Sequence, residues 1–233
     1  MLRGAELVHG SDVPLLGVNL GHVGFLAETE PDALASTVQH VAERRYEVEE
    51  RLTLHVDLLV GGVVRATSWA LNEVSVEKGS RERVLELVTE VDGRPVSTYG
   101  ADGVVMATPT GSTAYAFSAG GPVVWPGVQA LVMVPISAHA LFVRPLVVSP
   151  ESVLAVEVLE RNATEGIMWC DGRRAVAVPP GARVEVRRGD APVRLARIAT
   201  GPFTDRLVAK FHLPVGGWRG PEETGSPSSA RKG

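Results

Sequence analysis

Short apolar segments separated by glycine and proline fill the middle of the chain, and they limit what the chain can fold into. Between residues 46 and 199 apolar side chains recur at every second position, as at Leu52, Leu54 and Val56. A period of two places successive side chains on opposite faces of a strand, and the Gly-Gly and Asp-Gly pairs between the runs suit hairpin turns. The pattern predicts a β-sandwich-like body. The expected strands are residues 52–60, 63–71, 74–77, 84–91, 96–99, 104–107, 128–136, 146–149, 153–159, 166–170, 174–178, 183–188 and 193–199.

The two ends of the chain have different patterns. Residues 2–9 and 31–44 are predicted to be helices, the second with its apolar residues on one face. Between them, residues 13–20 (VPLLGVNL) form a mostly apolar run, typical of a parallel strand buried on both faces. A helix with one such strand cannot form a sheet, so we expect further strands to precede the sequence. Residues 203–211 are predicted to form a short amphipathic helix.

The charge and the cysteine content argue against several classes of function. The net charge is −4, so nucleic acid is not an expected partner. The single cysteine, Cys170, cannot form an internal disulfide, and we expect it to be a small packed residue in a reducing compartment. No apolar run approaches the roughly 20 residues of a membrane span, and residues 1–10 lack the pattern of a secretion leader. The chain is therefore expected to be cytoplasmic, with no membrane partner.

Residues 100–118, GADGVVMATPTGSTAYAFS, carry the most distinctive local pattern. An apolar run ends at a proline, and a small hydroxyl-rich turn follows before Tyr115, which predicts a strand, a tight turn and a helix. Such a turn presents free backbone N–H groups, which suit an anion or the polar edge of a nucleotide. The hydroxyls of Thr110, Ser112 and Thr113 add donors and acceptors. The alternative is a capped helix after a strand, with no ligand.

The residues of this stretch resemble the signature of the NAD kinases, the enzymes that phosphorylate NAD to NADP. DG…TPTGSTAY…GGP spans residues 102–122, and two further stretches match the family, GVNLGHVGFLAE at residues 17–28 and ALNEVSVEKG at residues 70–79. The resemblance extends from residue 1 to about residue 218. It implies transfer of the ATP γ-phosphate to the 2′-hydroxyl of the NAD adenosine ribose, with Mg²⁺ on the phosphates. It also implies NAD and ATP as partners and a homo-oligomer, either a dimer or a tetramer.

The resemblance assigns roles to several residues. Asn72 and Glu73 match a pair that contacts the adenosine part of NAD, where Asn both donates and accepts hydrogen bonds while Glu accepts them. Asp102 matches a carboxylate on the nicotinamide side, often lent across a subunit contact. The alternatives are a polar pair at a strand end and a turn residue. The other candidates are Thr113, Ala114, Tyr115 and Ser118 in the nucleotide-contacting run, Arg83 near phosphate or as an exposed strand arginine, and Asp171 and Arg173 in a pocket turn or a plain hairpin turn.

One family motif has no counterpart in the sequence. NAD kinases carry a Gly-Gly-Asp-Gly-Thr element before a helix that reads like residues 2–7; its glycines cradle ATP phosphates and its aspartate activates the 2′-hydroxyl. Met1 falls directly after that position, so we assign no catalytic residue and no metal ligand, and we expect the chain alone to be inactive. The alternatives are an NAD-binding fragment without catalysis and a related lipid kinase. Ser137 and His139 do not support a hydrolase, because no G-x-S-x-G elbow accompanies them.

The patterns and the resemblance together predict an α+β fold of two domains. Residues 1–45 are expected to be the remnant of an N-terminal α/β domain, and residues 46–202 a β-sandwich-like NAD-binding domain. Residues 203–218 are expected to return to the N-terminal domain. Residues 219–233 lack apolar side chains able to pack and are expected to be a disordered tail.

Overall fold

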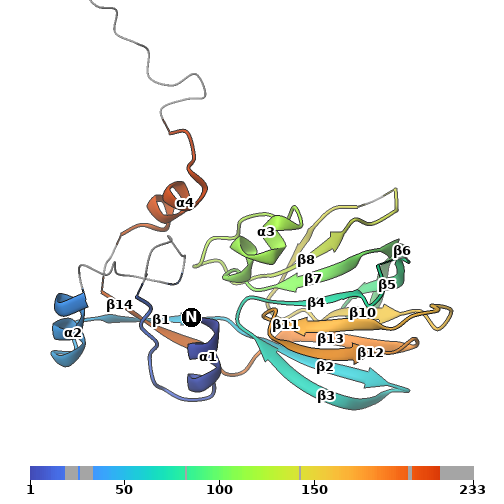
Figure 1. Ribbon diagram of the computed structural model, residues 1–233, viewed down its shortest axis with the longest axis horizontal. Helices are drawn as coiled ribbons and strands as arrows, with labels where there is room; N and C mark the ends of the chain where they lie inside the picture. Colours follow the sequence, from blue (N-terminus) through green and yellow to red (C-terminus); the bar gives the residue numbers. More distant parts are fainter. Residues whose placement is uncertain (19–25, 27–33, 82, 142, 199–200, 216–233) are drawn as a thin grey trace, which may run out of the picture.

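The computed structural model describes residues 1–18, 26, 34–81, 83–141, 143–198 and 201–215. Two six-stranded antiparallel sheets form the sandwich at the right of Figure 1. The first has the order β3 (Val63–Ala70), β2 (Leu54–Val60), β13 (Ala182–Arg188), β10 (Leu154–Val158), β5 (Leu85–Val91) and β6 (Arg94–Ala101). The second has the order β12 (Arg174–Val178), β11 (Gly166–Cys170), β4 (Glu73–Lys78), β7 (Gly103–Ala107), β8 (Leu131–Ile136) and β9 (Leu146–Val148).

The core of the sandwich lies between the two sheets. Along β2, Leu54, Val56 and Leu58 are buried, whereas His55 and Asp57 between them are only half-buried. The same alternation runs through β11 and β13, whereas β7 is buried at every position because its other face is covered as well. Each sheet thus presents one apolar face to its partner. Burying one such side chain contributes about 1.5–3 kcal/mol, and this makes the interlocked faces the main stabilising feature of the body. The sandwich predicted from the period of two is confirmed.

Tight turns with positive φ join neighbouring strands. Gly61 and Gly62 (φ 59° and 76°) connect β2 to β3, and Asp92 and Gly93 (φ 52° and 70°) connect β5 to β6. Positive φ at both central residues is the requirement of the type I′ hairpin, which glycine and aspartate meet at low cost. The carboxylate of Asp92 also accepts a hydrogen bond from the backbone N–H of Val153 at 2.8 Å.

A short helix covers part of the outer face of the second sheet. The chain runs from β7 through a 3₁₀ turn, Gly111–Thr113, into α3 (Tyr115–Ser118), which confirms the predicted strand, turn and helix. Ala116 of this helix packs with Val105 of β7 and Val132 of β8 in a separate small core. Figure 1 shows α3 over β7 and β8, at the side of the sheet on which β4 follows β7.

A two-stranded sheet outside the sandwich receives the N-terminal segment. It pairs β1 (Glu47–Arg51) with β14 (Val193–Arg197). The strand predicted at residues 13–20 is wrong for its described part: Leu15 forms only an isolated parallel bridge to Leu195, and residues 19–20 lie outside the described residues. Leu15 donates to the Arg194 carbonyl oxygen at 2.8 Å and accepts from the Ala196 N–H at 3.0 Å, so among the described residues of this run the contact with β14 is made at Leu15.

The longer helices lie at the two ends of the chain. Helix α1 (Leu2–Val8) buries Ala5 against Leu71 and Leu195. Helix α2 (Leu34–Ala42) ends earlier than predicted, before Arg44 turns to a φ of 53°. The start predicted for α2 at residue 31 and the predicted tail lie outside the described residues.

Helix α4 (Phe203–Phe211) is confirmed. It stacks Phe211 on Phe117 of α3, with ring centroids 4.3 Å apart. No helix within the described ranges is long and apolar enough to cross a membrane. The predicted α+β, two-domain fold class is confirmed, while the domain boundaries stay predictions.

Candidate functional site

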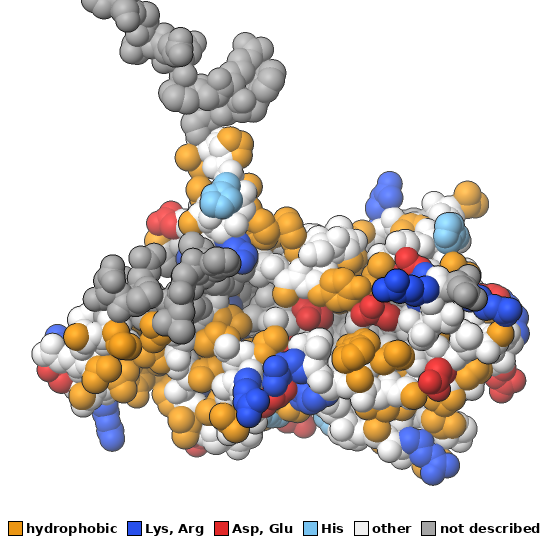
Figure 2. Space-filling view, in the orientation of Figure 1, with side chains coloured by type: hydrophobic (Ala, Val, Ile, Leu, Met, Phe, Trp, Pro, Cys, Tyr) orange, Lys and Arg blue, Asp and Glu red, His pale blue; other side chains and the backbone are white. Residues whose placement is uncertain are grey.

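A pocket lies on the outer face of strand β4, beside helix α3. Because side chains alternate along a strand, Glu73, Ser75 and Glu77 share this face, while Val74 and Val76 enter the sandwich core. Figure 2 shows acidic side chains gathered over this part of the sheet. The pocket measures about 410 Å³ and is lined by Glu73, Ser75, Glu77, Tyr115, Trp169 and Gly172.

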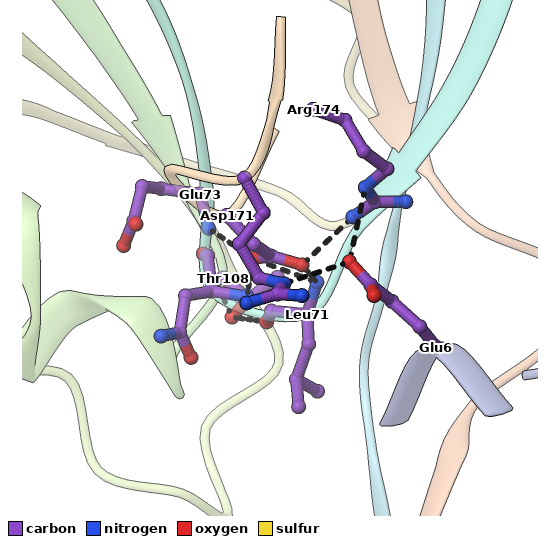
Figure 3. Close-up of polar contacts among 8 residues, drawn as sticks. Glu6, Leu71, Glu73, Thr108, Asp171 and Arg174 are labelled. Carbon is purple, nitrogen blue, oxygen red and sulfur yellow. Dashed lines mark hydrogen bonds and ion pairs between the residues drawn. The ribbon is translucent and has the colours of Figure 1, made fainter. Parts of the chain in front are cut away.

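The backbone that enters the pocket is held from two sides (Figure 3). On one side, the Thr108 hydroxyl donates to the Leu71 carbonyl oxygen at 2.7 Å, and the Thr108 N–H donates to the Asn72 carbonyl oxygen at 2.9 Å. On the other side, the Asp171 carboxylate accepts the N–H of Leu71 at 2.9 Å and that of Asn72 at 2.7 Å. The connection between β3 and β4 is therefore fixed immediately before Glu73.

Asp171 comes from the turn between β11 and β12, as the sequence predicts. Its φ is 53°, and its side chain points to the backbone of residues 71–73, where the amide of Glu73 lies 3.4 Å from the same carboxylate. Arg174 reaches this carboxylate at 3.1 Å and Glu6 of α1 at 3.5 Å. The exposed Arg173 also pairs with Glu6, at 3.1 Å. A direct contact of Asp171 or Arg173 with NAD stays a prediction.

Glu73 is the most electrostatically perturbed carboxyl group at the pocket. Only 8% of it is exposed, and burial, followed by the charge of Asp171, raises its pKa to about 7. Burial raises the pKa of Asp171 as well, but the backbone N–H donors of residues 71–73 and Arg174 oppose that shift. Hydrogen bonds to the charged form favour ionisation, so Asp171 is the more readily ionised of the two carboxyl groups and Glu73 the more readily protonated.

Two buried polar atoms at the pocket are left without a partner. They are Oε2 of Glu73 and Oδ1 of Asn72, neither of which has a hydrogen-bond partner in the part of the chain that the structure describes. Leaving such a group buried and unpaired costs about 1–3 kcal/mol. A ligand group that donates to either atom would remove part of this cost.

The hydroxyl-rich turn leads into Tyr115, which lines the pocket. Its hydroxyls are used within the turn: Ser112 donates to the Pro109 carbonyl oxygen at 2.7 Å, and Thr113 donates to the Thr110 carbonyl oxygen at 3.3 Å. A Cβ on Gly111 would lie 2.0 Å from the Asn72 carbonyl oxygen, so this approach requires glycine.

Helix α3 has four residues, too few for the anion site considered from the sequence. Of the predicted contacts, Thr113, Ala114 and Tyr115 are half-buried and Ser118 is exposed. Burial and the neighbouring Glu77 raise the pKa of Tyr115, so its hydroxyl remains a donor at neutral pH. Tyr115 lines the pocket, so its ring can pack against a ligand there.

Asp102 and Arg83 are not among the residues that line the pocket. Asp102 pairs with Lys78 at 2.5 Å, and that contact holds the pKa of Asp102 below its usual value. The charge of Asp102 is also among those that raise the pKa of Tyr115, so Asp102 lies within electrostatic reach of the pocket wall in its own chain. Arg83 is exposed in the connection between β4 and β5.

Four residues that line the pocket were not among the predicted site residues: Ser75, Glu77, Trp169 and Gly172, the last of which follows the predicted Asp171. Ser75 and Glu77 follow from Glu73 by a period of two, so the signal for them was present. Trp169 lies opposite Ser75 on β11, a pairing that depends on strand order and is not readable from the sequence. Among the described residues, no group of three His, Cys, Asp or Glu side chains is placed to hold a metal ion.

The sequence matches two family models. One describes the ATP-NAD kinase N-terminal domain and covers residues 1–46; the other describes the ATP-NAD kinase C-terminal domain and covers residues 71–198. An NAD kinase of Leifsonia xyli subsp. xyli is 67% identical over 222 residues, which cover 95% of this chain and 73% of the relative. NAD kinase 2 of Streptomyces coelicolor is 65% identical over 220 residues, with coverages of 94% and 73%.

Two solved structures are similar to the model. Yeast NADH kinase complexed with NADH superposes with a TM-score of 0.84 at 24% identity, which shows the fold; the match covers 92% of this chain and 64%, less than two thirds, of that one. An NAD kinase from Archaeoglobus fulgidus in complex with ATP has a TM-score of 0.70 at 28% identity, with coverages of 85% and 74%. With the C-terminal model spanning more than half of the sequence and relatives at 65% identity or more, the chain belongs to the ATP-NAD kinase family.

Proposed function

We propose that the chain binds the adenosine part of NAD in the pocket beside β4, and that the protein transfers the ATP γ-phosphate to the 2′-hydroxyl of the adenosine ribose to make NADP. The observation that carries the proposal is the pair of buried, unpartnered oxygens on Asn72 and Glu73 in the described part of the chain. Ribose hydroxyls and an adenine amino group are donors of the kind these atoms lack. The curated relatives named NAD kinase support the same reaction.

The proposed binding uses each wall of the pocket differently. Ionised Glu73 accepts hydrogen bonds from vicinal ribose hydroxyls, and the Asn72 amide faces the base. Tyr115 and Trp169 supply aromatic faces on which a planar ring can pack. Since phosphoryl transfer depends mostly on positioning and charge neutralisation, holding the ribose in a fixed orientation is the contribution assigned to these residues.

ATP is the proposed phosphate donor because the chain belongs to the ATP-NAD kinase family, and the Archaeoglobus fulgidus relative was solved in complex with ATP. Magnesium is assigned to the ATP phosphates. No described residue is proposed as its ligand, because the described carboxylates form no group suited to a metal. No step of the proposal passes through the metal.

The predicted dimer or tetramer and the cytoplasmic location belong to the same proposal. In an assembly, Asp102 would complete the nicotinamide side of a neighbouring subunit's pocket. The side chain of Asp102 is 39% exposed, and this exposure supports the role because the carboxylate is open to a partner subunit.

The test is calorimetric titration of the chain with NAD. Glu73→Ala is expected to weaken NAD binding by about 1.5–3 kcal/mol, the usual loss for a charge-assisted hydrogen bond. The control is Glu157→Ala, a half-buried glutamate on β10 in the other sheet. Equal NAD affinity in the wild type and Glu73→Ala, with a lowered melting temperature, would show the pair to be structural.

A second assay separates catalysis from binding. NADP formation is measured from NAD and magnesium-ATP for residues 1–233 and for the chain extended by the codons upstream of Met1. Because residues 1–233 alone are expected to be inactive, tight NAD binding without NADP formation by the extended chain would favour an NAD-binding module over a kinase. Failure to bind NAD would reject both functions, and phosphorylation of a lipid instead would support the related lipid kinase.

A further inference from the structure

We propose that Asp171 is a positioning residue for NAD: it fixes the backbone from which Asn72 and Glu73 reach the nucleotide, and Arg174 and Glu6 couple it to helix α1. The inference rests on the proposed function, since it concerns the same pocket. The side chains of Asp171, Arg174 and Glu6 bond protein atoms rather than the ligand, so their role is distinct from that of Asn72 and Glu73.

Both oxygens of the Asp171 carboxylate accept backbone hydrogen bonds. Oδ1 accepts the N–H of Asn72 at 2.7 Å, and Oδ2 accepts the N–H of Leu71 at 2.9 Å. The side chain is buried, and its own backbone N–H donates to the Glu73 carbonyl oxygen at 2.9 Å. A buried carboxylate that satisfies successive backbone donors leaves that segment one conformation, which preorganises the side chains it carries.

Thr108 fixes the opposite side of the segment at residues 71 and 72. Thr108 is fully buried and donates to the carbonyl oxygens of Leu71 and Asn72. With Asp171 holding the N–H groups and Thr108 the carbonyl groups, residues 71 and 72 cannot rotate without losing hydrogen bonds on both sides (Figure 3). The Asn72 and Glu73 side chains are thus aimed by contacts outside the pocket.

Charges of alternating sign lead from Asp171 through Arg174 to Glu6 of helix α1. Arg174 lies 3.1 Å from its carboxylate and 3.5 Å from Glu6, and its guanidinium stacks over Trp69 at 4.7 Å. Glu6 lies on α1, which otherwise joins the body through the apolar cluster around Ala5. The charge of Arg174 therefore links Glu6 on α1 to the carboxylate that holds the nucleotide-binding pair, while the hydrogen bond of Glu6 goes to the neighbouring Arg173.

The test compares two aspartates in matched turns. Asp171→Asn keeps the shape and suits the positive φ, but it removes one accepting oxygen and the charge. Asp92→Asn is the control, because Asp92 has the same Asp-Gly turn with positive φ and also accepts a backbone N–H, in the other sheet. We expect Asp171→Asn to raise the Kd for NAD by about 10–100-fold and Asp92→Asn to change it by less than about twofold.

A pH profile of NAD binding distinguishes positioning from a general loss of stability. The charged and titratable groups around Glu73 are Asp171, Glu77, Tyr115 and, through Asp171, Arg174. Binding is expected to strengthen as Glu73 ionises with rising pH. Removing the Asp171 charge favours that ionisation, so the midpoint for Asp171→Asn moves to lower pH.

The coupling to α1 is tested with Glu6→Gln against Arg3→Gln, an exposed change on the same helix. Glu6→Gln is expected to raise the Kd about fivefold and Arg3→Gln to leave it unchanged. Should the Asp171→Asn protein not fold, Arg174→Met replaces it, with the same expected direction of Kd.

The outcomes separate the two proposals. Wild-type protein that binds no NAD rejects the proposed function. Wild-type protein that binds NAD, with an Asp171→Asn variant that melts lower but keeps the wild-type Kd and pH midpoint, overturns the positioning role alone. Equal Kd values for Glu6→Gln and Arg3→Gln overturn the coupling.

Discussion

Replacing Glu73 with glutamine is predicted to stabilise the protein at pH 8 while weakening NAD binding. The pKa of Glu73 is raised from 4.5 to about 7 by burial and by Asp171. In a group whose folded-state pKa is raised, the stability contributed by the protonated form is complete below pH 4.5 and is lost as the pH rises through about 7. Glutamine has nearly the same shape and cannot ionise.

The size of the effect follows from the shift. About 2.5 pKa units at 1.36 kcal/mol each give roughly 3 kcal/mol as the cost of ionised Glu73 at pH 8. Glu73→Gln is therefore expected to raise the free energy of unfolding by up to about 3 kcal/mol at pH 8 and to change it far less at pH 4.5. The expected loss of NAD affinity runs the other way, because the amide replaces one accepting oxygen with a donor.

The assay is urea unfolding at the two pH values. Glu157→Gln on β10 serves as the control, with an expected change below about 0.5 kcal/mol at either pH. Equal effects of Glu73→Gln at pH 4.5 and pH 8, or a loss of stability that grows with pH, would refute the reasoning that Glu73 is held against ionisation.

Three further predictions concern the close approach at Gly111, the sandwich core and the oligomeric state. Gly111→Ala is expected to weaken NAD binding and lower the melting temperature, because its Cβ would lie 2.0 Å from the Asn72 carbonyl oxygen; an unchanged protein in both measurements would contradict this close approach. Met106→Ala in the sandwich core is expected to lower the free energy of unfolding by about 2–5 kcal/mol in a urea titration, and a loss below about 1 kcal/mol would place Met106 outside the core. Light scattering at micromolar concentration is expected to give the mass of a dimer or tetramer, and a monomer would count against the assembly.

The sandwich was predictable because its signal is local. A period of two with turn pairs such as Asp92-Gly93 specifies strands and hairpins without knowledge of their neighbours. Strand β1, Glu47–Arg51, has mostly charged residues, and its pairing with β14 depends on a residue separation that no local pattern encodes. The run at residues 13–20 misled for the same reason, since its apolar character says nothing about which neighbour it meets.

The site was predictable where single positions carry it. Asn72, Glu73 and Tyr115 could be chosen from the sequence; in the structure Glu73 and Tyr115 line the pocket, and Asn72 directly precedes Glu73. The hydrogen bonds from Asp171 to the backbone of residues 71 and 72 could not be predicted. An Asp-Gly pair predicts a turn, but it gives no indication of which backbone N–H groups its carboxylate will accept. Burial around Glu73, which sets its pKa, is likewise a property of the assembled sheets.

The most direct test of the account is a crystal structure of the protein with NAD bound. The account predicts the adenosine ribose against Glu73, with its hydroxyls donating to the carboxylate, the base near the Asn72 amide, and Asp171 still on the backbone N–H groups of Leu71 and Asn72. NAD bound elsewhere, for example in the cavity lined by Arg187 and Arg194, with the pocket beside β4 empty, would contradict it.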